Sequence, residues 1–185
     1  MIYILAGIAK SGKSKIALAI LEQKKLRMIS TDWIMMMLYH GNKDLNIDIH
    51  KSDISVSHML EPYIEGLIQA LIDSKKDILI EGVHIQPALA RKMMDQYPNK
   101  IRSVFLGYKE MDATTKTQEL RKHAETMENP WYMSMNDHEL YHLTTYMIHE
   151  SEKLYQTCLI HKLQYMEVKD VIKDQHQIIS ALFHT

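Results

Sequence analysis

The sequence lacks the features that would assign it to several special classes of protein. Its single cysteine, Cys158, excludes an intramolecular disulfide and a cysteine metal cluster, and one thiol fits a reducing compartment. No run approaches the roughly 20 apolar residues that a membrane-spanning helix needs. The apolar start at residues 2–6 is too short for a signal peptide and has no basic residues before it. We therefore expect a cytoplasmic protein without a membrane partner.

An excess of charge of either sign is also lacking. The 185 residues include 22 Lys and Arg against 23 Asp and Glu, a net charge of −1, which gives no reason to expect long nucleic acids as partners. The chain is 46% hydrophobic and is long enough to bury the core of one domain. Since no repeat, low-complexity tract or Gly/Pro-rich linker divides it, we predict a single domain over residues 1–185.

Short apolar runs alternate with helical patterns along the chain. The predicted strands cover residues 2–6, 26–30, 78–80, 101–108 and 164–168. The predicted helices cover residues 13–25, 33–39, 62–74, 87–97, 113–127, 134–161 and 174–183, and residues 41–52 are predicted to be a loop. This alternation is typical of an α/β fold with a five-stranded parallel sheet that helices cover on both faces.

The main chemical signal lies between the first strand and the first helix. Residues 7–14 read G-x-x-x-x-G-K-S, the Walker A pattern, in which backbone N–H groups and the helix N-terminus bind phosphate. Lys13 is expected to reach the β- and γ-phosphates of ATP, and Ser14 to bind Mg²⁺ through its hydroxyl. The predicted nucleotide-binding residues are Gly7, Ala9, Lys10, Ser11, Gly12, Lys13, Ser14 and Lys15.

Two acids follow predicted strands, where ligands gather at the carboxyl edge of a parallel sheet. Asp32 follows the second strand and is a candidate to accept a proton from an attacking hydroxyl or to hold a magnesium-bound water, with helix capping as the alternative. Glu81 ends the third strand like a Walker B acid and is a candidate for Mg²⁺ and substrate, or a solvated acid at a strand end. Gly82 is expected to leave space beside the phosphates, and His84 to contact the substrate.

Together, the Walker A loop, Ser30-Thr31-Asp32 and residues 80–84 resemble the small-molecule P-loop kinases, such as adenylate, shikimate and gluconate kinases. The sequence is also similar to 2-phosphoglycerate kinases and zeta-toxin-like kinases. The resemblance implies strand order 2-3-1-4-5, ATP and Mg²⁺ as cofactors, and transfer of the γ-phosphoryl group to a small hydroxyl-bearing acceptor, with Asp32 handling the acceptor hydroxyl.

Residues 109–133 are polar and charge-dense, and we predict that they form a lid insert. The resemblance implies lid arginines that neutralise the transferring phosphoryl group, and Arg121 stands in this segment with Lys116 and Lys122 nearby. The lid's usual Arg-rich signature is missing, and an exposed charged helix face is the alternative. Arg91, on the helix after the third strand, is a candidate to contact an anionic acceptor, or a surface arginine.

Two other function classes compete with a kinase. Residues 138–142 match H-E-x-x-H, a zinc-protease pattern, but His138 and His142 lie opposite the apolar stripe of their predicted helix. A P-loop ATPase or nucleotide-dependent switch is the main alternative. A GTPase is disfavoured because D-x-x-G is absent and residues 42–45 do not complete N-K-x-D.

Overall fold

The computed structural model describes residues 1–124 and 130–184. Five strands form one parallel sheet in the order β2-β3-β1-β4-β5, which confirms the predicted α/β fold and strand order. The strands are β1 (Ile2–Gly7), β2 (Arg27–Ser30), β3 (Ile78–Gly82), β4 (Ile101–Gly107) and β5 (Gln164–Glu167).

Helices cover both faces of this sheet. The α-helices are α1 (Lys13–Lys24), α2 (Thr31–Gly41), α3 (Asp53–Asp73), α4 (Pro87–Gln96), α5 (Ala113–His123), α6 (Asp137–Ile160) and α7 (Val171–Phe183). Short 3-10 helices, η1 (Lys43–Leu45) and η3 (Trp131–Ser134), precede α3 and α6. None of the helices in the described ranges combines the length and apolar character needed to cross a membrane.

Side chains that alternate along β1 divide the core into two layers. Ile2, Ile4 and Ala6 pack with α2, α3, α4 and α6, whereas Leu5 packs with α1 and α7. This period of two is the direct result of strand geometry, in which neighbouring side chains point to opposite faces. Because β1 is buried on both faces, its sequence is a continuous apolar run rather than an alternating one.

Helix α3 begins nine residues earlier than the predicted start at Pro62, so that prediction was wrong. Ser52 caps the helix by accepting a hydrogen bond from the backbone N–H of Ser55 at 3.3 Å. The buried stripe runs through Val56, Leu60 and Ile64, so the helix continues across the proline. Burying two more apolar side chains outweighs the hydrogen bond that Pro62 removes.

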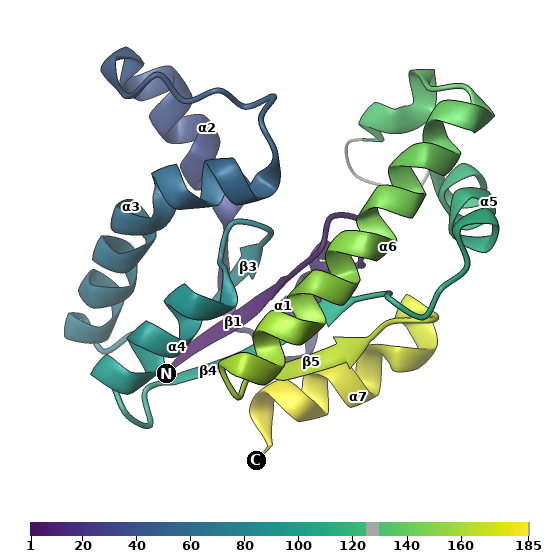
Figure 1. Cartoon of the computed structure of the whole chain (residues 1–185). Helices are drawn as coiled ribbons and strands as arrows, with labels where there is room; N and C mark the ends of the chain where they lie inside the picture. The colour runs from purple at the N-terminus through teal and green to yellow at the C-terminus, as the bar shows by residue number, and fades with distance from the viewer. Residues whose placement is uncertain (125–129, 185) are drawn as a thin grey trace.

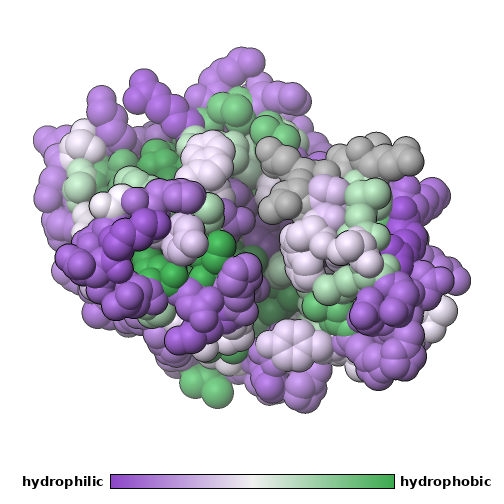
Figure 2. Space-filling model, turned by 90° about the horizontal axis from the view of Figure 1, so that it is seen from above, coloured by the Kyte–Doolittle hydropathy of each residue, from purple (hydrophilic) through white to green (hydrophobic). Residues whose placement is uncertain are grey.

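The fold leaves an open space above the carboxyl edge of the sheet. Helix α2 and the first turns of α3 stand on one side of it, and α5 and α6 stand on the other (Figure 1). Seen from above, the surface is hollowed between these two sides (Figure 2). A third small core of Leu120, Ala124, Tyr132 and Leu140 holds α5 against α6. Residues 125–129, within the predicted lid and the predicted helix 113–127, lie outside the described residues.

The close approach of Gly82 to Thr31 generates a stability prediction. A Cβ on Gly82, whose φ is +149°, would lie 1.8 Å from the Thr31 hydroxyl oxygen. We expect Gly82→Ala to lower the free energy of unfolding by about 2–5 kcal/mol, through backbone strain and overpacking. Urea denaturation measures this change.

Gly66 in α3 is the matched control, because nothing lies within 4 Å of its would-be Cβ. Gly66→Ala should raise the free energy of unfolding by about 0.5–1 kcal/mol, as for other helical glycines. Equal effects at the two positions would contradict the role assigned to the Gly82–Thr31 contact.

Candidate active site

The loop between β1 and α1 wraps closely around the N-terminus of α1. Gly7 has a φ of +137°, and a Cβ there would lie 2.0 Å from the Leu106 carbonyl oxygen of β4. Gly12, in the left-handed conformation with a φ of +85°, precedes the first helical residue, Lys13. Both glycines of the motif are therefore required by backbone geometry, and the loop has the form that binds phosphate at a helix N-terminus.

The Lys13 side chain folds back over this loop and is only 5% exposed. Its ammonium donates to the Ile8 carbonyl at 2.6 Å and lies 3.4 Å from the Ser11 hydroxyl. Burial lowers the pKa of Lys13 to about 8, against the opposing effect of Glu81, Asp53 and Asp32. A cation thus sits at the loop whose backbone N–H groups favour an anion.

Ser14 and Glu81 meet beside the loop. The Ser14 hydroxyl lies 3.5 Å from Oε2 of Glu81, which is 4% exposed. Burial raises the pKa of Glu81, while a hydrogen bond from Ser30 and the charge of Lys13 oppose that rise. In the described ranges no three metal-ligating side chains cluster. A hydroxyl and a carboxylate nonetheless fit Mg²⁺, which usually keeps several waters and takes further ligands from substrate phosphates.

Asp32 lies on the first turn of α2, facing His84. Its Oδ1 is 3.5 Å from Nδ1 of His84, and the Asp32 side chain is 63% exposed. The N-cap of α2 is Ser30, which accepts from the Asp32 backbone N–H at 3.3 Å, so the Asp32 carboxylate is not the helix cap. The structure therefore leaves this carboxylate at the surface beside the P-loop.

His84 is buried and joins β3 to α2. Its Nδ1 lies 3.1 Å from the Thr31 hydroxyl, and burial lowers its pKa, while the charges of Asp32 and Asp53 oppose that shift. The space that Gly82 provides is filled by Thr31, not left beside the phosphates as the sequence suggested. His84 thus supports the start of α2 and the position of Asp32.

Asp53 is a site residue that the sequence analysis missed. It is the first residue of α3, and its charge interacts with those of Lys13, His84, Asp32 and Glu150. The residue is exposed, yet desolvation by neighbouring protein atoms raises the pKa of its carboxyl, and the charges of Asp32 and Glu150 add to that rise. The sequence signal was the capping pair Ser52 and Ser55, which places Asp53 at a helix N-terminus.

Tyr108 is a second missed residue, located directly after β4. Its hydroxyl donates to the Ala9 carbonyl of the P-loop at 2.8 Å. The ammonium of Lys116, from α5, lies 4.4 Å from the centre of the Tyr108 ring and pairs with Glu119 at 3.1 Å. Lys116 is buried, so this predicted lid cation packs against the protein and connects α5 to the P-loop.

Three further predicted site residues, Arg121, Lys10 and Lys15, have contacts or positions other than those of Lys13, Ser14 and Asp32. The Arg121 guanidinium bonds Asp137 at 3.0 Å and the Met135 carbonyl at 2.5 Å, near the start of α6. Lys10 lies over the rings of Trp131 and Tyr132, at 5.9 and 5.2 Å from their centres, and Lys15 is exposed on α1.

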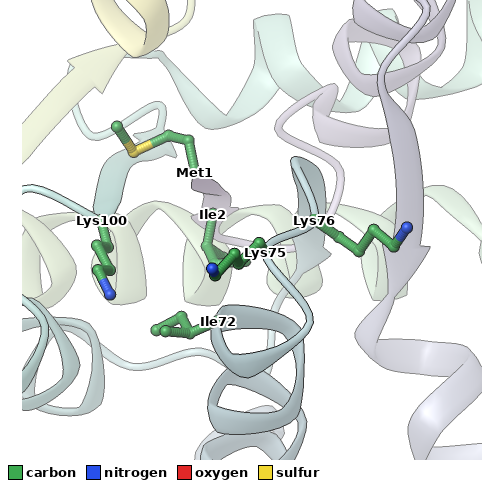
Figure 3. Close-up of a pocket in the computed structure, with 6 residues that line it drawn as sticks. All are labelled: Met1, Ile2, Ile72, Lys75, Lys76 and Lys100. Carbon is green, nitrogen blue, oxygen red and sulfur yellow. The ribbon is translucent and has the colours of Figure 1, made fainter.

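Arg91 is not brought to the P-loop. It pairs with Asp95 at 2.7 Å and lines a cavity of about 540 Å³ with residues that include Ile101 and Arg102, at the start of β4. Because the strands are parallel, this is the opposite edge of the sheet from the P-loop. A second cavity, of about 210 Å³, also lies there and is lined by Lys75, Lys100 and the first two residues of the chain, among others (Figure 3).

The H-E-x-x-H residues lie on the exposed face of α6, as expected. The Nε2 atoms of His138 and His142 are 3.1 Å apart, whereas Glu139 completes a capping box by accepting from the Asn136 backbone N–H at 2.8 Å. The glutamate of this motif thus caps the N-terminus of α6.

Comparison with solved structures identifies the architecture. Shikimate kinase from Bacteroides thetaiotaomicron matches with a TM-score of 0.61 and 14% identity over 100% of this chain and 99% of that one. This chain has the shikimate-kinase fold. An uncharacterized protein from Eubacterium ventriosum ATCC 27560 matches with a TM-score of 0.50 and 14% identity, covering 98% and 97% of the two chains. No protein-family model and no curated protein matches the sequence.

The burial of Lys13 generates a prediction about stability and pH. Its folded pKa of about 8 lies below the unfolded value of 10.5, so the unfolded chain binds more protons between these pH values and Lys13's contribution to stability rises across them. Below pH 8, burial of the charged Lys13 ammonium lowers the free energy of unfolding by its full amount, on the order of 3 kcal/mol. We expect Lys13→Met to be more stable than wild type at pH 7, with a difference that shrinks from pH 8 to 10.5.

Urea denaturation of both proteins at several pH values measures this difference. Taking the difference removes the effect of the other groups that titrate in alkali, because they are present in both proteins. A difference that does not change between pH 7 and 10.5 would show that Lys13 titrates normally.

The Tyr108–Ala9 hydrogen bond generates a second prediction. Tyr108→Phe removes one hydrogen bond to the P-loop backbone, which should cost about 1–2 kcal/mol of stability. Since the loop is then less firmly held, we also expect ADP affinity to fall about 3–10-fold by calorimetry. Tyr3→Phe, on β1 beside Phe183 at the face that α7 covers, is the control and should leave ADP affinity unchanged.

Proposed function

We propose that this protein is an ATP-dependent phosphotransferase that moves the γ-phosphoryl group to a hydroxyl of a small molecule. The observation that carries the proposal is that the phosphate-binding loop and a carboxylate that could accept a proton lie in one crevice. The P-loop with Lys13 and Ser14 lies on one side, and the exposed carboxylate of Asp32 lies beside it on the first turn of α2.

Each residue has a role in this proposal. Lys13 would bind the β- and γ-phosphates, and Ser14 with Glu81 would hold Mg²⁺ and its water shell. The other loop residues, from Gly7 to Lys15, would bind the nucleotide through their backbone and the helix N-terminus. Asp32 would accept the proton of the acceptor hydroxyl, with His84 holding it in position at 3.5 Å.

The segment 109–133 is proposed as a lid. Its described part packs on α6 through a small apolar core and reaches the P-loop through Lys116 and Tyr108. Closure of such a segment would exclude water, which competes with the acceptor for the phosphoryl group. For Arg121 to contact the transferring group, it would have to leave Asp137 and the Met135 carbonyl.

The test is ADP release from Mg-ATP over a panel of hydroxyl-bearing metabolites. An acceptor should raise turnover above the acceptor-free rate, and Lys13→Met and Asp32→Asn should each reduce that rise by at least about 100-fold. Asp73→Asn, at the far end of α3, is the matched control and should remain within about twofold of wild type. Slow hydrolysis that no acceptor stimulates would instead favour the P-loop ATPase or switch.

A further inference from the structure

A pair of histidines near the start of α6 takes no part in the phosphate chemistry described above. His138 and His142 are four residues apart, and both are exposed. Side chains at this spacing are neighbours on the surface of a helix. The two rings approach edge to face with their centres 4.3 Å apart, and their Nε2 atoms are separated by 3.1 Å. The helix therefore brings two imidazole nitrogens together, where they share one proton in a hydrogen bond.

The separation of the two Nε2 atoms matches that of two ligands on one metal ion. Zn²⁺ binds an imidazole nitrogen at about 2.0–2.1 Å, so nitrogens 3.1 Å apart would enclose an angle of about 98° at the metal. That angle lies between the roughly 90° of an octahedral site and the roughly 109° of a tetrahedral one. A metal ion could thus replace the shared proton after a rotation of the rings, without a movement of the helix.

The carboxylates next to the pair already have partners. Glu139 accepts from the Asn136 backbone N–H at 2.8 Å, and Asp137 pairs with Arg121 at 3.0 Å. In an H-E-x-x-H protease the glutamate is the general base, but here it is part of the capping box. The chain therefore keeps the metal-binding pair of this motif without its hydrolytic base. Over residues 1–124 and 130–184, no third histidine, cysteine or acid completes the set, so water would fill the remaining coordination positions.

We propose that His138 and His142 form a site for a transition-metal ion such as Zn²⁺, Ni²⁺ or Cu²⁺, bound through both Nε2 atoms. Imidazole suits these ions, whereas Mg²⁺ prefers oxygen ligands. The ion would hold together the first turns of α6, which include Asp137, the residue that anchors Arg121 of α5. Its role would be structural. The site includes no P-loop residue, so it does not depend on the phosphotransferase function proposed above.

The experiment is calorimetric titration of the full chain with Ni²⁺. His138→Ala and His142→Ala should each weaken Ni²⁺ binding about 10-fold or more, because the second ligand of a chelate acts at a high effective concentration. For the same reason, the double variant should be no more than about twofold weaker than either single variant. Among metals, wild type should bind Cu²⁺ more tightly than Ni²⁺ and Ni²⁺ more tightly than Mn²⁺, with no binding of Mg²⁺ at this pair.

His149→Ala is the matched control, because the chain has eleven histidines and His149 is exposed on the same helix. This variant should bind Ni²⁺ within about twofold of wild type, since a lone imidazole gains nothing from a second ligand. All three histidines are at the surface, so the variants should unfold at nearly the same urea concentration as wild type when no metal is added.

Urea denaturation with Ni²⁺ provides a second measurement. The chelate exists only while α6 is folded, so Ni²⁺ should raise the urea midpoint of wild type and of His149→Ala. It should leave the midpoints of His138→Ala and His142→Ala almost unchanged. This result would separate a site formed by the helix from general binding of the metal to histidines, which the unfolded chain also offers.

Three results would overturn the inference. The first is Ni²⁺ affinity that His138→Ala and His142→Ala leave unchanged, which would mean that the two rings form a hydrogen bond only. The second is an equal loss in His149→Ala, and the third is binding that does not raise the urea midpoint. None of these results bears on the phosphotransferase, because Mg-ADP affinity should be the same in wild type and in the histidine variants.

Discussion

The central position of β1 in the sheet is the constraint on which the candidate site depends. Its two neighbours are β3 and β4, so the ends of three parallel strands converge on the loop that follows Gly7. Ala6 lies opposite Gly82, and Gly7 lies opposite Leu106, which brings Glu81 and Tyr108 close to the loop without any long connection. A different strand order would separate these groups by at least one strand spacing of about 4.8 Å.

Charge in the crevice is arranged in two zones. Lys10 and Lys13 belong to the P-loop, whereas Asp32 and Asp53 belong to the wall formed by α2 and α3. Their mutual attraction offsets part of the desolvation that each group suffers. A phosphate chain would enter the basic zone, beside the acidic wall.

Much of the fold was readable from the sequence, because short apolar strands and the glycine motif are local signals. The start of α3 was misjudged because a proline in the first turn is common, and only the tertiary burial of Val56 and Leu60 shows that the helix continues. That error left Asp53 outside every predicted element. Arg91 could not be placed either, since the spacing of a helix after a strand does not show which edge of the sheet a side chain reaches. Tyr108 stood at the end of a predicted strand, so the rule that ligands gather at the carboxyl edge of a parallel sheet could have marked it, but the sequence analysis did not name it.

The Tyr108 hydrogen bond ends on a backbone carbonyl rather than on a side chain. Every residue type at position 9 supplies the same acceptor, so selection through this contact would act on position 108 and leave position 9 free to vary. The P-loop pattern leaves its intermediate positions undefined in sequence. Here, the backbone at one of those undefined positions accepts a hydrogen bond from a residue 99 positions away.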